Sequence, residues 1–438
     1  MDLLIAGYRE YKDSFYYVPS PLGERLMIPG RYIEELKTAP VEKVDFVGTF
    51  IAMFDGKYTS VGSRDLMPPR AVRVLLNQNL PDVMPGVQDE VRASFQSCMP
   101  RCDDDWAEVP LVDTINYVVA RASARMFGGE ALSSNEEWIQ TTLTFAVDVF
   151  TGARKVKSLP GFLKPVFGPF IKEVQAIKAH YRFAEKTIRP ILDRRRETGE
   201  EAKDLLYWLD SQAEDAHRRT WFLSDIMLKL SFASLHTSAA ACAQLIFDLC
   251  EHPEYVPLLR EEYAAVIAAD GRLGKACLAK MPLMDSVLRE SQRRNPLLLV
   301  TFERIITEGW DFKDGFRIPK GTMIGYPAIA VAMDPEIYPD PDRFDGSRFA
   351  RMRRENPNQQ GKAQYVACNA EHMTFGYGRH ACPGRFFAAD EIKAIMVYLL
   401  ENYDCKYKRG ERRPQSLQFE TQNIPDHRAK VLFKRRSA

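Results

Sequence analysis

The feature that most constrains the fold is a stretch without formal charge that runs from Leu230 to Phe247. It just reaches the length of a membrane-spanning helix, but it carries serine, threonine, histidine and glutamine side chains, which are too polar for lipid. It belongs to a helical pattern over 225–250 that is apolar nearly all the way round, with Ser224 and Asp225 as a predicted N-cap. A helix of this kind must be covered by other helices, so we expect a mainly α protein with this helix at its centre.

The remaining chain supports a mainly α fold with small sheets at one side. Apolar side chains recur at helical spacing from Asp82 to Ala279, and again over 284–294 and 384–402. Short runs rich in β-branched and aromatic residues predict strands in a hairpin over 15–28 with its turn at 19–24, in residues 300–330, and in the C-terminal tail.

Two further segments lack a clear period. Residues 45–66 are aromatic and punctuated by glycine, which predicts a loop. Residues 156–170 alternate apolar rings and lysines with helix breakers, and predict a loop that rests on a membrane surface, lines a substrate entrance or packs between helices. We find neither internal repeats nor a linker, so we expect one domain over 1–438.

Composition excludes several classes of protein. The chain has 438 residues, 45% of them hydrophobic and 27% charged, which is typical of a globular protein. Its net charge is +1, so no overall field attracts nucleic acid, and we expect no nucleic-acid partner. The eight cysteines are sparse and unpaired in spacing, and Cys98 and Cys102 do not match a zinc half-site, which favours a reducing compartment. No signal peptide or N-terminal membrane anchor is evident in the sequence given.

Residues 375–384, FGYGRHACPG, place one cysteine in a glycine-rich loop just before the last helix. The glycines allow tight turns, Arg379 and His380 can neutralise anions, and free N–H groups at a helix start favour a thiolate at Cys382. Pro383 has no backbone N–H, so the sulfur is expected to accept backbone hydrogen bonds from later residues such as Gly384 and Arg385. A lone buried cysteine is usually inert. The combination of glycines, basic side chains and a following helix around Cys382 is what predicts that it is a ligand.

This loop resembles the ligand signature of the cytochrome P-450 family of haem-thiolate monooxygenases. The signature runs Phe-x-x-Gly-x-basic-x-Cys-x-Gly, and it is matched by Phe375, Gly378, His380, Cys382 and Gly384, with histidine where arginine is commoner. The resemblance extends over nearly the whole chain. It implies a single helix-rich domain with haem b (iron protoporphyrin IX) between the long central helix and the cysteine-loop helix, and Cys382 as axial ligand to the iron.

Other residues fit the same family in the same order. Glu290 and Arg293 resemble its Glu-x-x-Arg helix, and Arg348 resembles the third member of its Glu-Arg-Arg network; the first two share a helix face, and all three could form charge-assisted bonds. An isolated Glu–Arg pair at this spacing would usually be a solvated one. By family correspondence Arg304 and His380 bind the haem propionates, and either Arg70 or Arg73 adds a further contact.

The long helix carries the residues that the resemblance places on the oxygen side. Thr237 resembles the family threonine that handles protons during oxygen activation, although a helical threonine more often bonds back to its own helix. His236 stands where a carboxylate is usual, and it is either a proton relay or a space-filling residue. Ser234 replaces a small glycine and could bring a hydroxyl near the haem.

Family correspondence also assigns a substrate pocket. Its residues are mostly apolar, which favours a lipophilic small molecule such as a terpenoid or another fungal secondary metabolite. The pocket prediction comprises Phe50, Leu230, Ala233, Ser234, Leu299 and Phe302.

The resemblance further implies O2 as co-substrate and an NADPH–cytochrome P-450 reductase as electron donor, because the chain shows no flavin or nicotinamide motif. A reductase is expected to dock on a basic face made of Arg289, Arg351, Arg353, Arg354, Arg379, Arg385 and Lys393. The expected location is the cytosolic face of the endoplasmic reticulum membrane, with the membrane surface as a further contact. Two alternatives to oxygen insertion stay open: oxidative coupling, desaturation or rearrangement without net insertion, which His236 favours, and a non-catalytic haem-binding protein.

Overall fold

The computed structural model describes residues 1–20, 23–214, 217–270, 274–356 and 361–437. These residues form two compact units, which we describe separately. Unit 1 comprises Met1–Met53, Pro282–Arg385 and Pro414–Asp426. Unit 2 comprises Phe54–Met281, Phe386–Arg413 and His427–Ala438. The expectation of a single domain over the whole chain stays a prediction.

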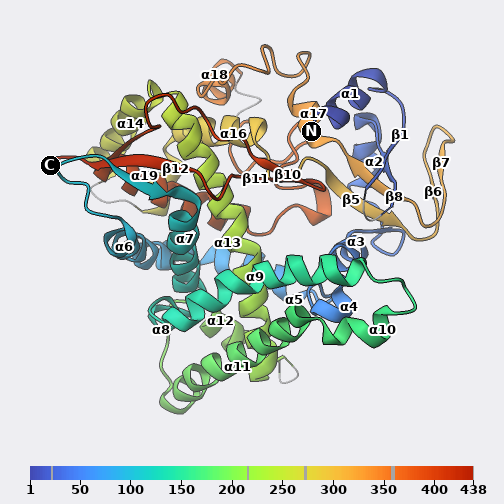
Figure 1. Ribbon diagram of the computed structural model, residues 1–438, viewed down its shortest axis with the longest axis horizontal. Coiled ribbons are helices and arrows are strands. Elements are labelled where there is room, and N and C mark those ends of the chain that lie inside the picture. Colours follow the sequence, from blue (N-terminus) through green and yellow to red (C-terminus); the bar gives the residue numbers. More distant parts are fainter. Residues whose placement is uncertain (21–22, 215–216, 271–273, 357–360, 438) are drawn as a thin grey trace. The chain divides into compact units, whose positions relative to one another are not determined.

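Unit 1 is built on a five-stranded sheet whose strand order is β1-β2-β8-β5-β3 (Figure 1). The predicted hairpin is present, since β1 and β2 pair antiparallel; two residues of its turn, 21 and 22, lie outside the described residues. β8 pairs parallel with β2 and antiparallel with β5. The strands are β1 (Tyr16–Val18), β2 (Arg25–Met27), β3 (Val44–Asp45), β5 (Thr301–Ile306) and β8 (Met323–Tyr326).

Strand alternation gives this sheet two apolar faces, because successive side chains point to opposite sides. Leu26 and Ile28 belong to one cluster, with Phe302, Ile306 and Ile324. Met27, between them in sequence, belongs to a second cluster with Leu4, Leu299, Val300 and Ile329. The sheet is therefore covered on both sides within unit 1.

Short helices and two-stranded pairs complete unit 1. The helices are α1 (Asp2–Glu10), η1 (Gly30–Tyr32), α2 (Ile33–Leu36), α3 (Phe46–Met53), α16 (Pro282–Arg294), α17 (Ala328–Ala332), α18 (Arg348–Glu355) and η5 (Gly378–His380). The pairs are β6 (Trp310–Asp311) with β7 (Arg317–Ile318), and β10 (Leu417–Phe419) with β11 (Gln422–Ile424).

The prediction of a loop over 45–66 is wrong for much of that range. Residues 46–53 form α3, and Gly56–Thr59 form α4 of unit 2. The side chain of Asp45 accepts a hydrogen bond from the amide of Gly48 at 2.8 Å, which satisfies a free N–H group at the start of α3. The glycines that suggested a loop are tolerated because this local bond starts the helix.

Unit 2 is helical around α13 (Thr220–Glu251), which packs against α7, α9 and α11 (Figure 1). The predicted N-cap at Ser224 and Asp225 is wrong, because the helix begins four residues earlier, and Ser224 bonds back to the carbonyl of Trp221. The other helices are α5 (Met67–Arg70), the π-helix η2 (Ala71–Leu76), α6 (Leu80–Cys98), α7 (Leu111–Gly128), α8 (Glu130–Ser133), α9 (Glu136–Lys157), α10 (Lys164–Phe167), η3 (Gly168–Phe170), α11 (Lys172–Thr198), α12 (Leu205–Gln212), α14 (Tyr255–Asp270), α15 (Lys275–Ala279) and α19 (Arg385–Asn402).

One small sheet joins distant parts of unit 2. Its strands are β4 (Ala107–Pro110), β9 (Tyr403–Lys406) and β12 (Lys430–Arg435), and β12 pairs antiparallel with both others. α13 is long and apolar enough to cross a membrane by length and composition, but most of its apolar window is buried inside the protein. This agrees with the expected central helix.

Candidate active site

The loop that holds Cys382 is fixed by backbone contacts within unit 1. Gly376 and Gly378 have positive φ angles of 70° and 72°, which a side chain would strain. At Gly378 a Cβ atom would also lie 2.5 Å from the carbonyl oxygen of Lys37, so no other residue fits there. The amide of Cys382 donates to the carbonyl of Phe375 at 2.7 Å. The cysteine therefore occupies a defined position in a stiff loop.

The surroundings of the Cys382 sulfur act on its charge in opposite directions. Burial raises the pKa of the thiol, while backbone hydrogen bonds from Gly384 and Arg385 and the charge of Arg385 lower it; the net pKa is raised. Because Pro383 has no N–H, these two bonds were expected to come from the amides of Gly384 and Arg385, and they do. Because the net effect favours the neutral thiol, a nearby cation is needed to hold the thiolate. A sulfur with these backbone donors fits a soft metal ion.

Arg304 is a buried cation with no hydrogen bond to a carboxylate among the described residues, although the nearby charges of Glu303 and Asp45 act on it. Its side chain is 4% exposed, and its hydrogen bond among the described residues goes to the carbonyl of Glu303 at 2.7 Å. The guanidinium carbon lies 4.6 Å and 4.4 Å from the ring centres of Phe46 and Phe302, and burial lowers the pKa of Arg304 to about 10. The ring centre of His380 lies 5.1 Å from that of Phe46. A buried cation with no bonded carboxylate fits a ligand with acidic groups, such as a haem propionate.

The structure brings Glu290, Arg293 and Arg348 together with almost no exposure to solvent. Arg293 forms two hydrogen bonds to the Glu290 carboxylate, at 2.8 and 2.9 Å, and Arg348 forms a third at 3.1 Å. The remaining donors of the two arginines bond to backbone carbonyls, those of Ala332, Pro339, Asp340, Pro341 and Arg343. This network ties α16 to the segment before α18.

Thr237 and Ala233 are exposed, one turn apart, in the largely buried middle of α13. The hydroxyl of Thr237 donates to the carbonyls of Ala233 at 2.9 Å and Ser234 at 3.1 Å, so its oxygen keeps free lone pairs on the exposed side. Ser234 is buried, and its hydroxyl bonds to the carbonyl of Ser231 at 3.2 Å. Of the predicted polar residues on this face, Thr237 is therefore the accessible one.

His236 is a neutral imidazole at physiological pH. Burial lowers its pKa to about 4, and its Nε2 atom has no hydrogen-bond partner among the described residues. A proton relay near pH 7 needs a group that gains and loses protons in that range. The observation therefore weighs against a relay through His236 and favours the space-filling alternative.

Glu391 is a buried acid that the sequence patterns did not single out. It lies on α19 in unit 2, fully buried, and accepts a hydrogen bond from Ser123 at 2.8 Å. Burial raises the pKa of Glu391 to about 7, although Ser123 and Ser238 lower it. The Ser238 hydroxyl and the second carboxylate oxygen do not complete a hydrogen bond. The sequence feature that could have predicted this buried acid is the position of Glu391 among the apolar side chains of the last helix.

Replacing Glu391 with glutamine is expected to stabilise the protein increasingly as pH rises. The folded protein binds the Glu391 proton more tightly than the unfolded chain, so the wild type loses stability between the ordinary pKa of 4.5 and about 7. Glutamine carries no such penalty and keeps the acceptor for Ser123. The gain of the variant over wild type should grow by about 2 kcal/mol between about pH 5.5 and about pH 8.

Urea unfolding at the two pH values measures this difference. Glu401→Gln, at an exposed position near the end of α19, is the matched control and should show a gain that does not change with pH. A pH-independent gain for Glu391→Gln would contradict the assignment of a raised pKa.

The predicted pocket residues occur in both units. In unit 1, Leu299 is buried in the sheet core, Phe302 lies beside Arg304 with a strained φ of 52°, and Phe50 lies 6.3 Å from the ring of Phe46. In unit 2, Leu230 is partly exposed on the same helix as Ala233. A bulky residue with positive φ is rare and is found mainly at functional sites.

Two residues predicted to lie on the basic face for a reductase, Arg289 and Lys393, are buried instead. Arg289 is 2% exposed and donates to the carbonyls of Gln364 and Ala367, and Lys393 is 4% exposed and donates to the carbonyl of Leu278. Both cations satisfy backbone carbonyls that would otherwise be buried without partners. Arg354 and Arg379 remain exposed.

Comparison with known proteins supports these observations. The family model described as Cytochrome P450 matches residues 75–433. Cytochrome P450 monooxygenase AN1598 of Emericella nidulans is 36% identical over 98% of this chain and 82% of its own length. Ent-kaurene oxidase P450-4 of Gibberella fujikuroi is 31% identical over 98% of this chain and 87% of its own length.

A solved structure shows the same fold. Retinoic acid bound cyanobacterial CYP120A1 superimposes with a TM-score of 0.74 at 19% identity, covering 98% of this chain and 93% of the other. The family match spans most of the chain, and the relatives are similar over nearly its full length. The chain therefore belongs to the cytochrome P450 family of haem-dependent monooxygenases.

Proposed function

We propose that this protein inserts one oxygen atom from O2 into a lipophilic substrate, a terpenoid or another secondary metabolite, with electrons from an NADPH-dependent reductase. The observation that carries the proposal is the stiff loop around Cys382, with its backbone donors to the sulfur, together with the buried cation Arg304 in the same unit. The names of the ent-kaurene oxidases among the relatives support a terpenoid.

Several residues of unit 1 would hold haem b. Cys382 would bind the iron as thiolate, while the amides of Gly384 and Arg385 moderate the charge of its sulfur. Arg304 and His380 would hold the acidic groups of the porphyrin. When bound, the haem supplies the activation of O2. The network of Glu290, Arg293 and Arg348 keeps the surrounding backbone in place.

Reduction in the presence of carbon monoxide, followed by turnover, tests the proposal. The holoprotein should show the red-shifted absorption of thiolate-bound haem, and lipophilic compounds should shift its ferric spectrum. With reductase and NADPH, a product heavier by one oxygen atom supports insertion. A product without added oxygen supports coupling, desaturation or rearrangement, the alternative that His236 favours. Haem binding without turnover of any compound would contradict both.

An aromatic cluster beside α13 supports a lipophilic substrate. The Phe232 ring on α13 lies 5.6 Å, 5.8 Å and 5.8 Å from the rings of Phe54, Phe145 and Phe150. Phe54, Phe145 and Phe232 are buried, so Phe150, at 38% exposure, is the ring of this cluster that offers a dispersion contact. Such a surface suits a hydrocarbon skeleton better than a polar one.

Replacing Thr237 with alanine is expected to uncouple electron use from product formation. The hydroxyl is exposed on α13 and keeps acceptor capacity, so it can hold a proton-carrying water molecule. We expect the product formed per NADPH to fall severalfold while hydrogen peroxide rises by a similar factor. Measuring both with O2 consumption checks this, and Thr237→Ser should restore coupling. Unchanged coupling in the alanine variant would remove Thr237 from proton handling.

Residues 162–170, which include α10 and η3, are proposed to contact the cytosolic surface of the endoplasmic reticulum membrane. Four apolar side chains there are more than half exposed, namely Phe162 at 79%, Val166 at 57%, Phe167 at 53% and Phe170 at 78%. Lys155, Lys157 and Lys164 are close in sequence, and Lys155 and Lys164 are paired with Glu173 and Asp55. The exposed rings therefore carry most of the proposed contact, which the lysines support at the polar boundary of the lipid.

The double variant Phe162→Ser with Phe170→Ser is therefore expected to bind vesicles at least roughly tenfold more weakly, since each ring contributes about 1.5 kcal/mol or more when buried in lipid. Sedimentation with vesicles of phosphatidylcholine and phosphatidylserine measures the change. Leu417→Ser, which removes an apolar side chain of 60% exposure in unit 1, is the control and should bind as wild type. Equal binding by all three proteins would place the contact elsewhere.

A further inference from the structure

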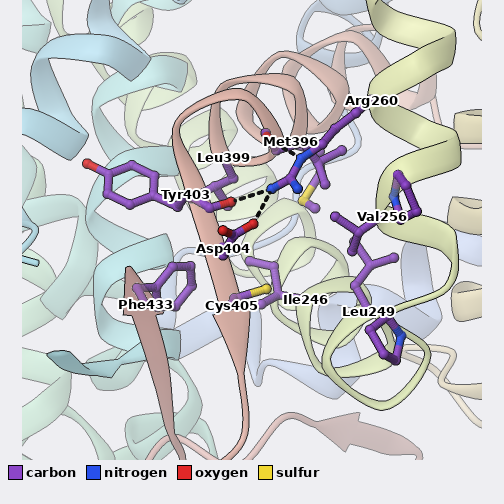
Figure 2. A pocket seen from close by; sticks show the side chains of 13 residues that line it. Ile246, Leu249, Val256, Arg260, Met396, Leu399, Tyr403, Asp404, Cys405 and Phe433 are labelled. Atoms are coloured by element: carbon purple, nitrogen blue, oxygen red, sulfur yellow. Dashed lines mark hydrogen bonds and ion pairs between the residues drawn. The ribbon is translucent and has the colours of Figure 1, made fainter. Parts of the chain in front are cut away.

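A cavity of about 260 Å³ lies within unit 2, away from the residues discussed above (Figure 2). The end of α13, α14, α19 and strands β9 and β12 line it, and it is partly open to solvent. Most lining side chains are apolar: Ile246, Leu249, Pro253, Val256, Pro257, Met396, Leu399, Leu400, Tyr403 and Phe433, with Arg260, Asp404 and Cys405 as the others. The cavity therefore suits an apolar molecule.

The charged groups at this cavity are already paired. Arg260 donates to the carboxylate of Asp404 at 2.7 Å and to the carbonyls of Leu400 at 2.7 Å and Tyr403 at 2.9 Å (Figure 2). The charge of Arg260 is therefore balanced within the lining by Asp404. The chemically reactive group among the lining residues is the thiol of Cys405, on β9.

A second thiol lies in contact with that of Cys405. Cys250, the penultimate residue of α13, interacts with the side chain of Cys405, and this interaction together with burial raises the pKa of Cys250. Both cysteines are free and partly exposed. The two sulfurs belong to segments 155 positions apart, yet both lie at the junction of α13 with β9.

We propose that Cys405 and Cys250 form an oxidisable dithiol that opens into this cavity and is converted to a disulfide by an organic hydroperoxide. The Cys405 sulfur attacks the terminal peroxide oxygen, the O–O bond breaks, and an alcohol leaves with a proton, giving a sulfenic acid. The Cys250 sulfur then displaces that oxygen as water and forms the S–S bond. The two thiols are oxidised by two electrons, and the hydroperoxide is reduced to an alcohol and water.

The roles of the two cysteines follow from their positions. Cys405 lines the cavity and Cys250 does not, so an entering hydroperoxide meets Cys405 first. Cys250 lies behind it and resolves the sulfenic acid. The apolar lining selects a hydroperoxide with an apolar tail over hydrogen peroxide, because the tail is removed from water in the cavity. The resulting bond would join the end of α13 covalently to β9.

The test uses the holoprotein with imidazole added to block the haem iron, and compares cumene hydroperoxide with hydrogen peroxide. We expect the chain to lose the mass of two hydrogen atoms, and peptide mapping to find Cys250 linked to Cys405. Cumene hydroperoxide should act at least roughly tenfold faster than hydrogen peroxide at equal concentration. Met396→Trp, which fills the cavity, should remove this preference while leaving the hydrogen peroxide reaction unchanged.

Three cysteine variants complete the experiment. Cys250→Ser should stop at the sulfenic acid of Cys405, which dimedone traps, and Cys405→Ser should leave Cys250 reduced. Cys98→Ser is the matched control and should oxidise as wild type. Thiols that stay reduced in the wild type, or a disulfide that forms without Cys405, would overturn the proposal. The absorption of each variant with carbon monoxide confirms that it is folded, so failure of this proposal is distinguishable from failure of haem binding.

Discussion

Replacing Cys382 with serine is expected to abolish the red-shifted absorption that the reduced protein gives with carbon monoxide, and with it all turnover. A serine hydroxyl is a harder and more weakly donating ligand than a thiolate, and it does not ionise in this site. The loop itself should survive, because its conformation depends on Gly376, Gly378 and the bond from residue 382 to the carbonyl of Phe375 rather than on sulfur. The effect is thus a loss of ligation in a folded protein.

A neighbouring thiol supplies the control for this experiment. Cys368 is also partly buried in unit 1, and its sulfur makes long contacts of 3.7 Å and 3.9 Å to the carbonyls of Val366 and Phe375. Cys368→Ser should keep the red-shifted absorption and the activity. If Cys382→Ser kept the absorption, or Cys368→Ser lost it, the ligand would have to be reassigned.

Replacing Glu290 with glutamine is expected to lower the free energy of unfolding by about 3–5 kcal/mol, which is the usual cost of removing one partner from a buried ion pair. Glu290 and Arg293 are fully buried, and Arg348 nearly so. A neutral amide would leave two buried guanidinium groups without a counter-charge. Because the whole stability of a protein is of the order of 5–15 kcal/mol, we also expect poor accumulation of haem-loaded protein.

An exposed ion pair in the same unit separates burial from charge. Asp311 and Arg317 lie 3.2 Å apart, and both side chains are 66% exposed. Asp311→Asn should change the free energy of unfolding by less than about 1 kcal/mol, since water screens an exposed pair. Urea denaturation of both variants measures the contrast. Equal effects would mean that the Glu290 network contributes no more than a surface salt bridge.

The conformation of the cysteine loop and the pairing within the ion network could largely be predicted from the sequence. Both depend on fixed residue types at fixed short spacings, so the glycines around Cys382 and the pairing of Glu290 with Arg293 were predictable before the structure. The long central helix was predictable too, because a segment without charge and with helical spacing must be buried. Its beginning was not, since Ser224 bonds back within the helix rather than capping it.

The features that the sequence did not predict depend on contacts between residues that are distant along the chain. Arg289 and Lys393 look like surface cations, and only the carbonyls of Gln364, Ala367 and Leu278 explain why they are buried. Contact between Cys250 and Cys405 needs the junction of α13 with β9. No local pattern encodes such proximity, so it emerges only from the folded chain.

The fit of Gly378 against Lys37 has a consequence for how the holoenzyme is made. The amide of Arg379 bonds to the carbonyl of Lys37, and the ammonium of Lys37 bonds to the hydroxyl of Tyr377, 340 positions later. The ribosome releases the first of these segments long before it makes the second. Cys382, the proposed iron ligand, can reach its final geometry only when both have emerged. Cofactor capture therefore has to wait until synthesis is almost finished, and the early segment must stay available until then.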